Sequence, residues 1–305
     1  MQILAGVGAA GTTSVAGYIA GGTDVGGNLS AIDRIAFPGD TKTTLVATLS
    51  AVTFSAVGFA DSGVAGYVAG GQDNGGGTTK VDKISFPAEA RTTLVATLAA
   101  GRSFGGGFAN SSVAGYDGGG FGGTNSIDKI AFPADTISTI AATLTATTQF
   151  LAGMADSGVA GYFGGGSGAT LFSRIDKLTF PADTKTTLVA TLSTARDQLG
   201  AMANSAVAGY FGGGEDSGGK ISGIDKITFP TDTKSTLTPT LTAAITDLTG
   251  MADTGVAGYF NGGNTTVLVS TIDKITFPGD TKSTLVATLS TARRRASGFA
   301  DCGVF

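Results

Sequence analysis

The 305-residue sequence contains no histidine, no tryptophan and only one cysteine. Without histidine, sites in which a histidine base activates serine or cysteine are excluded, and so are metal sites with imidazole ligands. The single cysteine, Cys302, allows neither an intrachain disulfide nor a cysteine-based zinc site. It stands where other copies of the repeat described below have serine or threonine, so we interpret it as a small turn residue. We therefore expect no metal site, no cofactor and no catalytic residue.

Charged residues are also scarce, at 14% of the chain, and the formal net charge is −4. A weakly acidic protein has no general attraction for nucleic acid or for anionic membranes. The N-terminal stretch MQILAGVGAAG has no basic residue and its apolar run is broken, which is typical of neither a signal peptide nor a membrane span. We expect no nucleic-acid partner and no insertion into a membrane.

Glycine and β-branched residues dominate what is present. The chain has 50 glycines, and its only glutamates are Glu89 and Glu215, so its composition favours strands over helices. Residues 15–22 read VAGYIAGG, which first suggests a phosphate-binding loop. Such a loop occurs once per nucleotide and continues into Lys-Ser or Lys-Thr, and neither condition holds here.

The motif Val-Ala-Gly-Tyr instead occurs six times, and each copy leads to a glycine pair. It accounts for all six tyrosines, which follow one another at intervals of 49, 49, 46, 48 and 49 residues: Tyr18, Tyr67, Tyr116, Tyr162, Tyr210 and Tyr259. A period near 48 residues in a strand-forming chain indicates a β-propeller.

Each repeat contains four strand-like pieces. In the second repeat these are SAVGFAD, VAGYVAGG, KVDKISFP and RTTLVATL, within residues 55–98. The Asp-Ser-Gly link between the first two favours a tight hairpin. We predict an all-β, six-bladed propeller with four antiparallel strands per blade, forming a single domain over residues 1–305. Glycine and alanine are expected in the crowded inner strands, and bulkier Ile, Phe and Leu in the outer two.

The two ends of the chain resemble parts of one repeat. The opening LAGVGAAGTTS is a poor copy of the first strand, whereas ASGFADCGVF at the end is a good one. We predict that residues 296–305 form a strand that joins the first blade and closes the ring, with residues 1–14 beside it or peripheral. Closure removes the open edges that a linear array of strands exposes.

The order AGYFGGG, IDKITF, TLVATL and STARDQLGAM resembles the repeat of the kelch family of β-propellers. The tryptophan usual on an outer strand of that repeat is absent, and leucine or isoleucine stands near its place in each copy. The wording Gly-Tyr-x-x-Gly-Gly and Ile-Asp-Lys-Ile is also similar to kelch-type repeats of tailed-phage virion proteins. The resemblance implies a kelch-like fold and a place among virion components.

Carboxylates recur once per repeat at two further positions. The first set precedes lysine or arginine, and we interpret it as fold-maintaining, with a functional ring as the alternative: Asp33, Asp82, Asp128, Asp176, Asp225 and Asp273. The second set lies in Asp-Thr-Lys turns, where we expect a side chain that caps its own turn: Asp40, Asp183, Asp232 and Asp280. The tyrosines are expected to pack and to form hydrogen bonds.

The links between strands differ in how uniform they are. In a four-stranded blade, the first-to-second and third-to-fourth links lie on one face of the disc, and here they are nearly identical in all copies. The second-to-third links and the links between blades lie on the other face, and they diverge. We predict a binding surface on the diverged face. Its candidate residues are Arg102, Phe121, Phe172, Arg196, Asp197, Glu215, Asp216, Arg293, Arg294 and Arg295.

The sequence favours a non-enzymatic structural or binding propeller, a phage virion component such as a tail, fibre or decoration protein. Its expected partners are other virion or surface proteins and, as a further class, glycans. The alternative is a secreted or cell-surface lectin-like propeller that binds glycans. A carboxylate-based hydrolase stays open because that chemistry does not strictly require histidine, and Asp197, Glu215 and Asp216 would be its candidate carboxylates.

Overall fold

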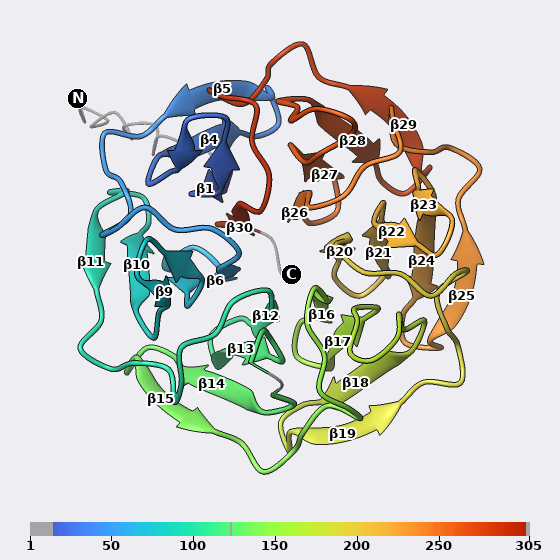
Figure 1. The fold of residues 1–305 in the computed structure, drawn as a ribbon, viewed down its shortest axis with the longest axis horizontal. Coiled ribbons are helices and arrows are strands. Elements are labelled where there is room, and N and C mark those ends of the chain that lie inside the picture. The colour runs from blue at the N-terminus through green and yellow to red at the C-terminus, as the bar shows by residue number, and fades with distance from the viewer. Residues whose placement is uncertain (1–14, 123, 303–305) are drawn as a thin grey trace, which may run out of the picture.

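The computed structural model describes residues 15–122 and 124–302 (Figure 1). Six antiparallel sheets of four strands surround a central axis like the blades of a propeller, and the described part of the chain contains no helix. The structure therefore confirms the predicted all-β, six-bladed propeller.

The strands of each blade are given from the axis outward. The first blade consists of β30 (Ser297–Ala300), β1 (Ala16–Ala20), β4 (Ile32–Ala36) and β5 (Thr41–Thr44). The second consists of β6 (Val57–Asp61), β7 (Ala65–Ala69), β10 (Val81–Ser85) and β11 (Arg91–Thr93). The third consists of β12 (Gly106–Asn110), β13 (Ala114–Gly118), β14 (Ile127–Ala131) and β15 (Thr136–Thr139).

The remaining blades follow the same order. The fourth consists of β16 (Ala152–Asp156), β17 (Ala160–Gly164), β18 (Ile175–Thr179) and β19 (Thr184–Thr187). The fifth consists of β20 (Gly200–Asn204), β21 (Ala208–Gly212), β24 (Ile224–Thr228) and β25 (Thr233–Thr236). The sixth consists of β26 (Thr249–Asp253), β27 (Ala257–Asn261), β28 (Ile272–Thr276) and β29 (Thr281–Thr284).

The first blade takes its innermost strand from the other end of the chain. Strand β30 pairs antiparallel with β1, with Gly17 opposite Ala300 and Ala20 opposite Ser297. This pairing closes the ring, and Figure 1 shows β30 beside β1 near the axis. Residues 1–14, expected beside this strand or peripheral, and residues 303–305 lie outside the described part of the chain.

The two faces of the disc have different connections. On the first, which we call the turn face, the short turns of one blade meet through the bond from Phe37 N–H to the Val15 carbonyl. On the second, the loop face, second-to-third links meet the links between blades, as in the bond from Gly22 N–H to the Thr53 carbonyl. The uniform links therefore share one face and the diverged links the other.

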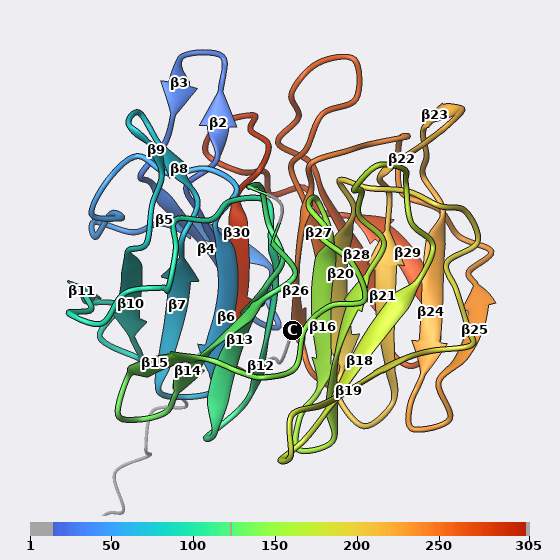
Figure 2. The same ribbon diagram turned by 60° about the horizontal axis from the view of Figure 1, so that its bottom comes forward.

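Three of the diverged links form short β-ribbons, which the glycine-rich sequence does not predict. They are β2 (Thr23–Asp24) with β3 (Gly27–Asn28), β8 (Gln72–Asp73) with β9 (Gly76–Gly77), and β22 (Glu215–Asp216) with β23 (Gly219–Lys220). In each ribbon an aspartate carboxylate accepts a bond from the glycine N–H two residues on, which stabilises the turn. Figure 2 shows these ribbons rising from the loop face.

The glycine of each Val-Ala-Gly-Tyr motif makes room for a bulky side chain from the preceding blade. A Cβ atom at Gly161 would lie 2.0 Å from the ring of Phe108, and one at Gly209 would lie 2.2 Å from the Met154 sulfur. The expectation that bulky residues occupy only the outer strands is therefore wrong. The innermost strands carry six buried knobs: Phe59, Phe108, Met154, Met202, Met251 and Phe299.

We predict that Gly161→Ala lowers the free energy of unfolding by about 1–3 kcal/mol, because the new methyl group must displace the buried Phe108 ring. Urea denaturation followed by circular dichroism measures the change. Gly39→Ala is the matched control, since nothing lies within 4 Å of the place its new methyl group would take and Ala88 and Ala134 already stand at equivalent turn positions. Equal effects of the two substitutions would contradict the knob-and-pocket packing.

Candidate functional site

Most recurrent polar residues bind one blade to the next. Tyr116 of the third blade donates its hydroxyl proton to Oδ1 of Asp183 in the fourth, at 2.7 Å, and Lys129 Nζ lies 2.7 Å from Oδ2 of the same carboxylate. Five joints of this kind use aspartate, namely Asp40, Asp135, Asp183, Asp232 and Asp280. In the remaining joint, Glu89 accepts from Tyr18 and pairs with Arg34.

The expectation that these aspartates cap their own turns is thus wrong, because their carboxylates bind the tyrosine and lysine of the preceding blade. The tyrosines pack and form hydrogen bonds as predicted. Burial, and then the bonded carboxylate, raises the pKa of Tyr116 and Tyr162 well above the usual tyrosine value. Both therefore remain protonated donors at all physiological pH values.

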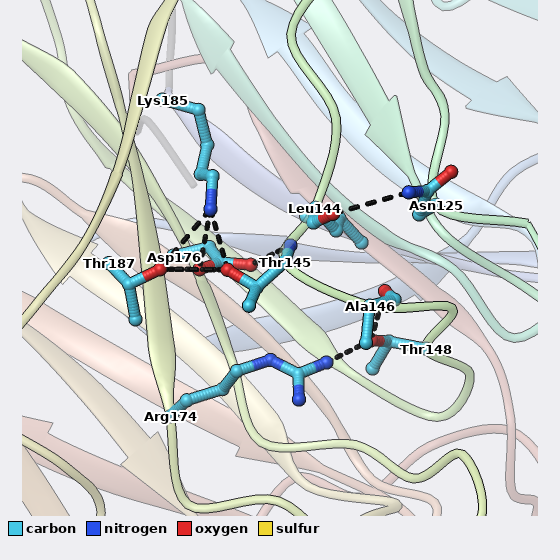
Figure 3. A network of polar contacts seen from close by, with 9 residues as sticks. All are labelled: Asn125, Leu144, Thr145, Ala146, Thr148, Arg174, Asp176, Lys185 and Thr187. Atoms are coloured by element: carbon cyan, nitrogen blue, oxygen red, sulfur yellow. Dashed lines mark hydrogen bonds and ion pairs between the residues drawn. The ribbon is translucent and has the colours of Figure 1, made fainter.

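The second recurrent carboxylate also holds two blades together. Asp176 accepts a bond from Thr187 of its own blade at 2.6 Å and one from the backbone N–H of Thr145 in the preceding blade's link at 2.8 Å (Figure 3). The other five members accept an equivalent threonine hydroxyl and backbone N–H. These bonds confirm the fold-maintaining interpretation.

Three arginines predicted on the binding surface lie inside the ring instead. Arg102, Arg196 and Arg293 are 3%, 0% and 0% exposed. Their guanidinium groups pair with the recurrent aspartates Asp128, Asp225 and Asp33, respectively, and donate to backbone carbonyls. They stabilise alternate joints between blades, so they are not part of the exposed loop face.

In the pair of Arg196 and Asp225, the pKa values of both partners are lowered. Burial lowers the pKa of Arg196, and Asp225 partly offsets this. Burial alone would raise the pKa of Asp225, but bonds from the Ser193 N–H and the Thr236 hydroxyl, together with Arg196, lower it. A buried pair of this kind holds its charges only because each partner is also hydrogen-bonded.

Six residues close a ring of backbone bonds around the axis on the loop face. Each lies two residues before the innermost strand of a blade, and its N–H donates to the carbonyl of the corresponding residue one blade earlier, at 2.7–2.9 Å. We call these residues the rim: Ser55, Phe104, Phe150, Gln198, Asp247 and Arg295. The last bond, from Ser55 N–H to the Arg295 carbonyl, completes the circle.

All six rim residues have left-handed backbone conformations, with φ between 54° and 60°. Glycine adopts this conformation without strain, whereas in other residues it costs roughly 1–2 kcal/mol each. This chain uses glycine at many of its positive-φ positions but at none of the six on the rim. The rim therefore has side chains at six positions where the backbone conformation favours glycine. Neighbouring rim residues differ in type, except Phe104 and Phe150.

The rim side chains surround a central cavity of about 120 Å³. One side is aromatic: the rings of Phe104 and Phe150 lie 4.4 Å apart between centroids. The other side is polar, where Arg295 Nε lies 3.1 Å from Asp247 Oδ1 and the Arg295 guanidinium sits 5.0 Å from the centre of the Phe104 ring. The floor consists largely of the glycines of the innermost strands. This arrangement can hold a small group that has one apolar and one polar side.

The other predicted residues lie at or around this cavity. Arg295 belongs to the rim, and Arg294 lies next to it, 3.5 Å from Asp247. Farther from the axis, Asp197 and Glu215 form a backbone bridge, and Phe121, which is 58% exposed, contacts Phe104 edge-on.

Two predicted residues serve their own links. Asp216 bonds the N–H of Gly218 in its ribbon, and Phe172 stacks beneath the guanidinium of Arg174 at 3.6 Å. The loop face therefore contains most of the predicted set, but only Arg295 lines the central cavity.

Of the six rim residues, only Arg295 is among those predicted from the sequence. The signal was present in the links between blades, which read AGRSF, ATTQF, TARDQ, AAITD and TARRR and whose last letters are rim residues. The column formed by those letters differs from blade to blade, except that Phe104 and Phe150 are alike. The arginines are the more conspicuous feature of these links and are candidates for that reason. The last residue of each link, however, is the one that lies on the rim.

No protein-family model matches this sequence. No curated protein matches it either. Within residues 15–122 and 124–302, no group of three His, Cys, Asp or Glu side chains is placed to hold a metal ion. No helix long and apolar enough to cross a membrane occurs in the same ranges.

One buried carboxylate lies directly behind the rim. Asp117 occupies the position taken by Ile19, Val68 or phenylalanine in other blades, and it is fully buried. Neither of its oxygens has a hydrogen-bond partner in the described structure, since Arg102, 3.9 Å away, donates to backbone and to other side chains. Burial raises the pKa of Asp117 to about 7, although Arg102 opposes the shift.

We predict that Asp117→Val stabilises the protein, and increasingly so as the pH rises from about 4 to about 7. In the unfolded chain the carboxyl group loses its proton near its ordinary pKa of 3.8, but in the folded state only near 7. The wild type therefore loses stability across this interval, by several kcal/mol at about 1.4 kcal/mol per pKa unit, and no more above it. Urea denaturation at several pH values measures the difference, and a difference independent of pH would refute the assignment.

The left-handed backbone of the rim can be tested by substituting glycine for Gln198. Gln198→Gly should change the free energy of unfolding by less than about 1 kcal/mol, because relief of the left-handed backbone offsets the added chain entropy. Asp183→Gly, at an equally left-handed backbone, should cost about 2–3 kcal/mol, because Tyr116 and Lys129 lose their acceptor. Thermal denaturation compares the two. Equal losses would show that the rim side chain is structural.

Proposed function

We propose that this protein is a non-enzymatic binding propeller that recognises its ligand at the rim of the loop face. The observation that carries this proposal is the ring of six residues with strained, left-handed backbones, which is closed by backbone bonds and takes no part in the tyrosine–carboxylate joints between blades. Backbone strain that no structural contact of the side chain offsets is found mainly at functional sites, such as those that bind a ligand.

The contrast with the other recurrent left-handed position supports the same conclusion. Each aspartate of the joints also has a positive φ, and in each case its carboxylate accepts from the preceding blade. The side chain there offsets the strain by holding the ring together. The rim residues share no contact of this sort and differ in chemistry. This supports the proposal that their side chains contact a ligand outside the ring.

The biological setting is a separate part of the proposal. The resemblance of the repeat to kelch-type repeats of tailed-phage virion proteins supports a tail, fibre or decoration protein that presents the rim to a partner or to the host surface. A secreted or cell-surface location is the alternative. Both settings require a binding face that is accessible from outside, and the loop face provides one.

We predict that fluorescently labelled protein binds to cells of some members of a panel of Gram-negative and Gram-positive bacteria. Phe104→Gly and Gln198→Gly should each lower the apparent affinity at least tenfold, because they remove contacts from the rim at positions where glycine suits the backbone. Flow cytometry measures the bound label as a function of protein concentration.

Ala206→Gly is the matched control, since Ala206 also has a left-handed backbone (φ 65°) but lies in a turn on the opposite face. Its binding should equal that of the wild type. Binding that persists in both rim variants, or the absence of binding to every cell type, would refute the proposed role of the rim.

A further inference from the structure

We infer that the rim cavity binds one uncharged pyranose ring of a glycan, with an adjoining sugar over the third and fourth blades. The inference rests on the proposed function, since it takes the rim as the binding site and specifies what the rim recognises. It follows from the size of the cavity, its division into an apolar and a polar side, and its balance of charge.

The size of the cavity sets the size of the ligand group. A cavity of about 150 Å³ in another protein holds one benzene molecule, so the rim cavity, at about 120 Å³ and open to solvent, accommodates a group of about one six-membered ring. A folded peptide segment or a nucleobase stack does not enter such a space. The ligand therefore inserts a single ring and leaves the rest of the molecule outside.

The aromatic side offers an apolar surface to one face of that ring. Phe104 and Phe150 line the cavity, and Phe54 and Phe121 meet Phe104 edge-on at 6.2 and 6.4 Å between centroids. The C–H bonds on a pyranose face are weakly polar and present hydrogen atoms, which suit the electron-rich faces of aromatic rings. The side chains of this half of the rim, Phe104 and Phe150, have no hydrogen-bonding groups that a ligand must pair with.

The polar side presents both donors and acceptors. Gln198 carries an amide, Asp247 a carboxylate and Ser55 a hydroxyl whose oxygen has no hydrogen-bond partner among the described residues. A sugar hydroxyl both donates and accepts, so several hydroxyls around one ring match this mixture. A tyrosine side chain has the same ring size but only one hydroxyl. The distribution of polar groups therefore favours a sugar over a peptide aromatic residue.

Within the rim, the single carboxylate of Asp247 balances the guanidinium of Arg295, and Arg294 beside the rim also engages Asp247. Asp247 lies 3.1 Å from Arg295 and 3.5 Å from Arg294, so the carboxylate is paired and the site has no unpaired negative charge to attract a cation. The arginines are likewise engaged with Asp247. A ligand that carries a carboxylate must compete with this pair, whereas neutral hydroxyls can bond to its free lone pairs and N–H groups. We therefore assign the ring as uncharged.

A second cavity, of about 370 Å³, lies beside the rim between the third and fourth blades. It is lined by Phe121 and by the polar side chains of Thr147, Gln149 and Ser167. Because Phe121 contacts Phe104, the aromatic surface extends without a break from the rim to this cavity. An exposed aromatic side chain beside hydroxyl and amide groups repeats the chemistry of the rim, which fits a second sugar in the same chain.

The test is an array of immobilised neutral and acidic oligosaccharides, probed with the wild type and with Gln198→Gly, Phe121→Ala and Ala206→Gly. We expect neutral oligosaccharides to bind the wild type and Ala206→Gly equally. Gln198→Gly should bind at least tenfold more weakly, and Phe121→Ala should lose affinity for a disaccharide but not for the monosaccharide at its end. Binding confined to acidic sugars, or equal in all variants, would overturn the inference.

Treatment of bound bacterial cells separates this inference from the proposed function. Periodate cleaves vicinal diols and should abolish rim-dependent binding, whereas protease treatment should leave it. Rim-dependent binding that survives periodate but is lost after protease would overturn the sugar assignment and keep the rim as a protein-binding site. Full retention of binding in every rim variant would overturn both.

Discussion

Each blade is joined to the next by a tyrosine hydroxyl and a cationic side chain that meet on one carboxylate at the neighbour's edge, as Tyr116 and Lys129 do on Asp183. The cation is a lysine in five joints and Arg34 in the sixth. A single four-stranded sheet buries one face on each neighbour and has no core of its own, so its stability depends on these joints and on the Phe or Met side chain inserted above each motif glycine. The joint from Tyr259 to Asp40 makes the ring continuous. The same geometry at every joint requires the same residues, which explains why those positions scarcely vary.

The rim exists because the joints fix it. With six blades held at equal spacing, the residues before the innermost strands come close enough for a circle of backbone bonds at 2.7–2.9 Å. Those bonds set the left-handed backbone and the positions of the Cα atoms, but they involve no side chain. The side chains are therefore free to differ, and Phe104, Gln198 and Asp247 do differ. A rim held by its backbone is preorganised, so less conformational entropy is lost when a ligand binds.

The architecture was predictable from the sequence because the residues that each blade requires recur in all six repeats. The motif period indicated the blades, and the good copy of the first strand at the end of the chain indicated that β30 joins β1. The candidate site was harder to predict, because an arginine in a diverged link is expected to be exposed to solvent, whereas three of these arginines are buried. Whether Arg196 points outward or toward Asp225 depends on a partner 29 residues away, which the local sequence does not reveal. The rim itself depends on a circle of bonds between links of all six blades.

Asp117 is a position at which the third blade departs from the repeat. The same strand position holds an apolar side chain in the other blades, and a carboxylate there has lost its hydration without gaining a hydrogen bond. It lies against Gly105, which follows the rim residue Phe104; a Cβ at Gly105 would come within 2.8 Å of its oxygen. The third blade thus combines the least favourable core residue with the most aromatic section of the rim. Because the joints on both sides of this blade are intact, the ring tolerates the local cost of a buried carboxylate that lies next to the central cavity.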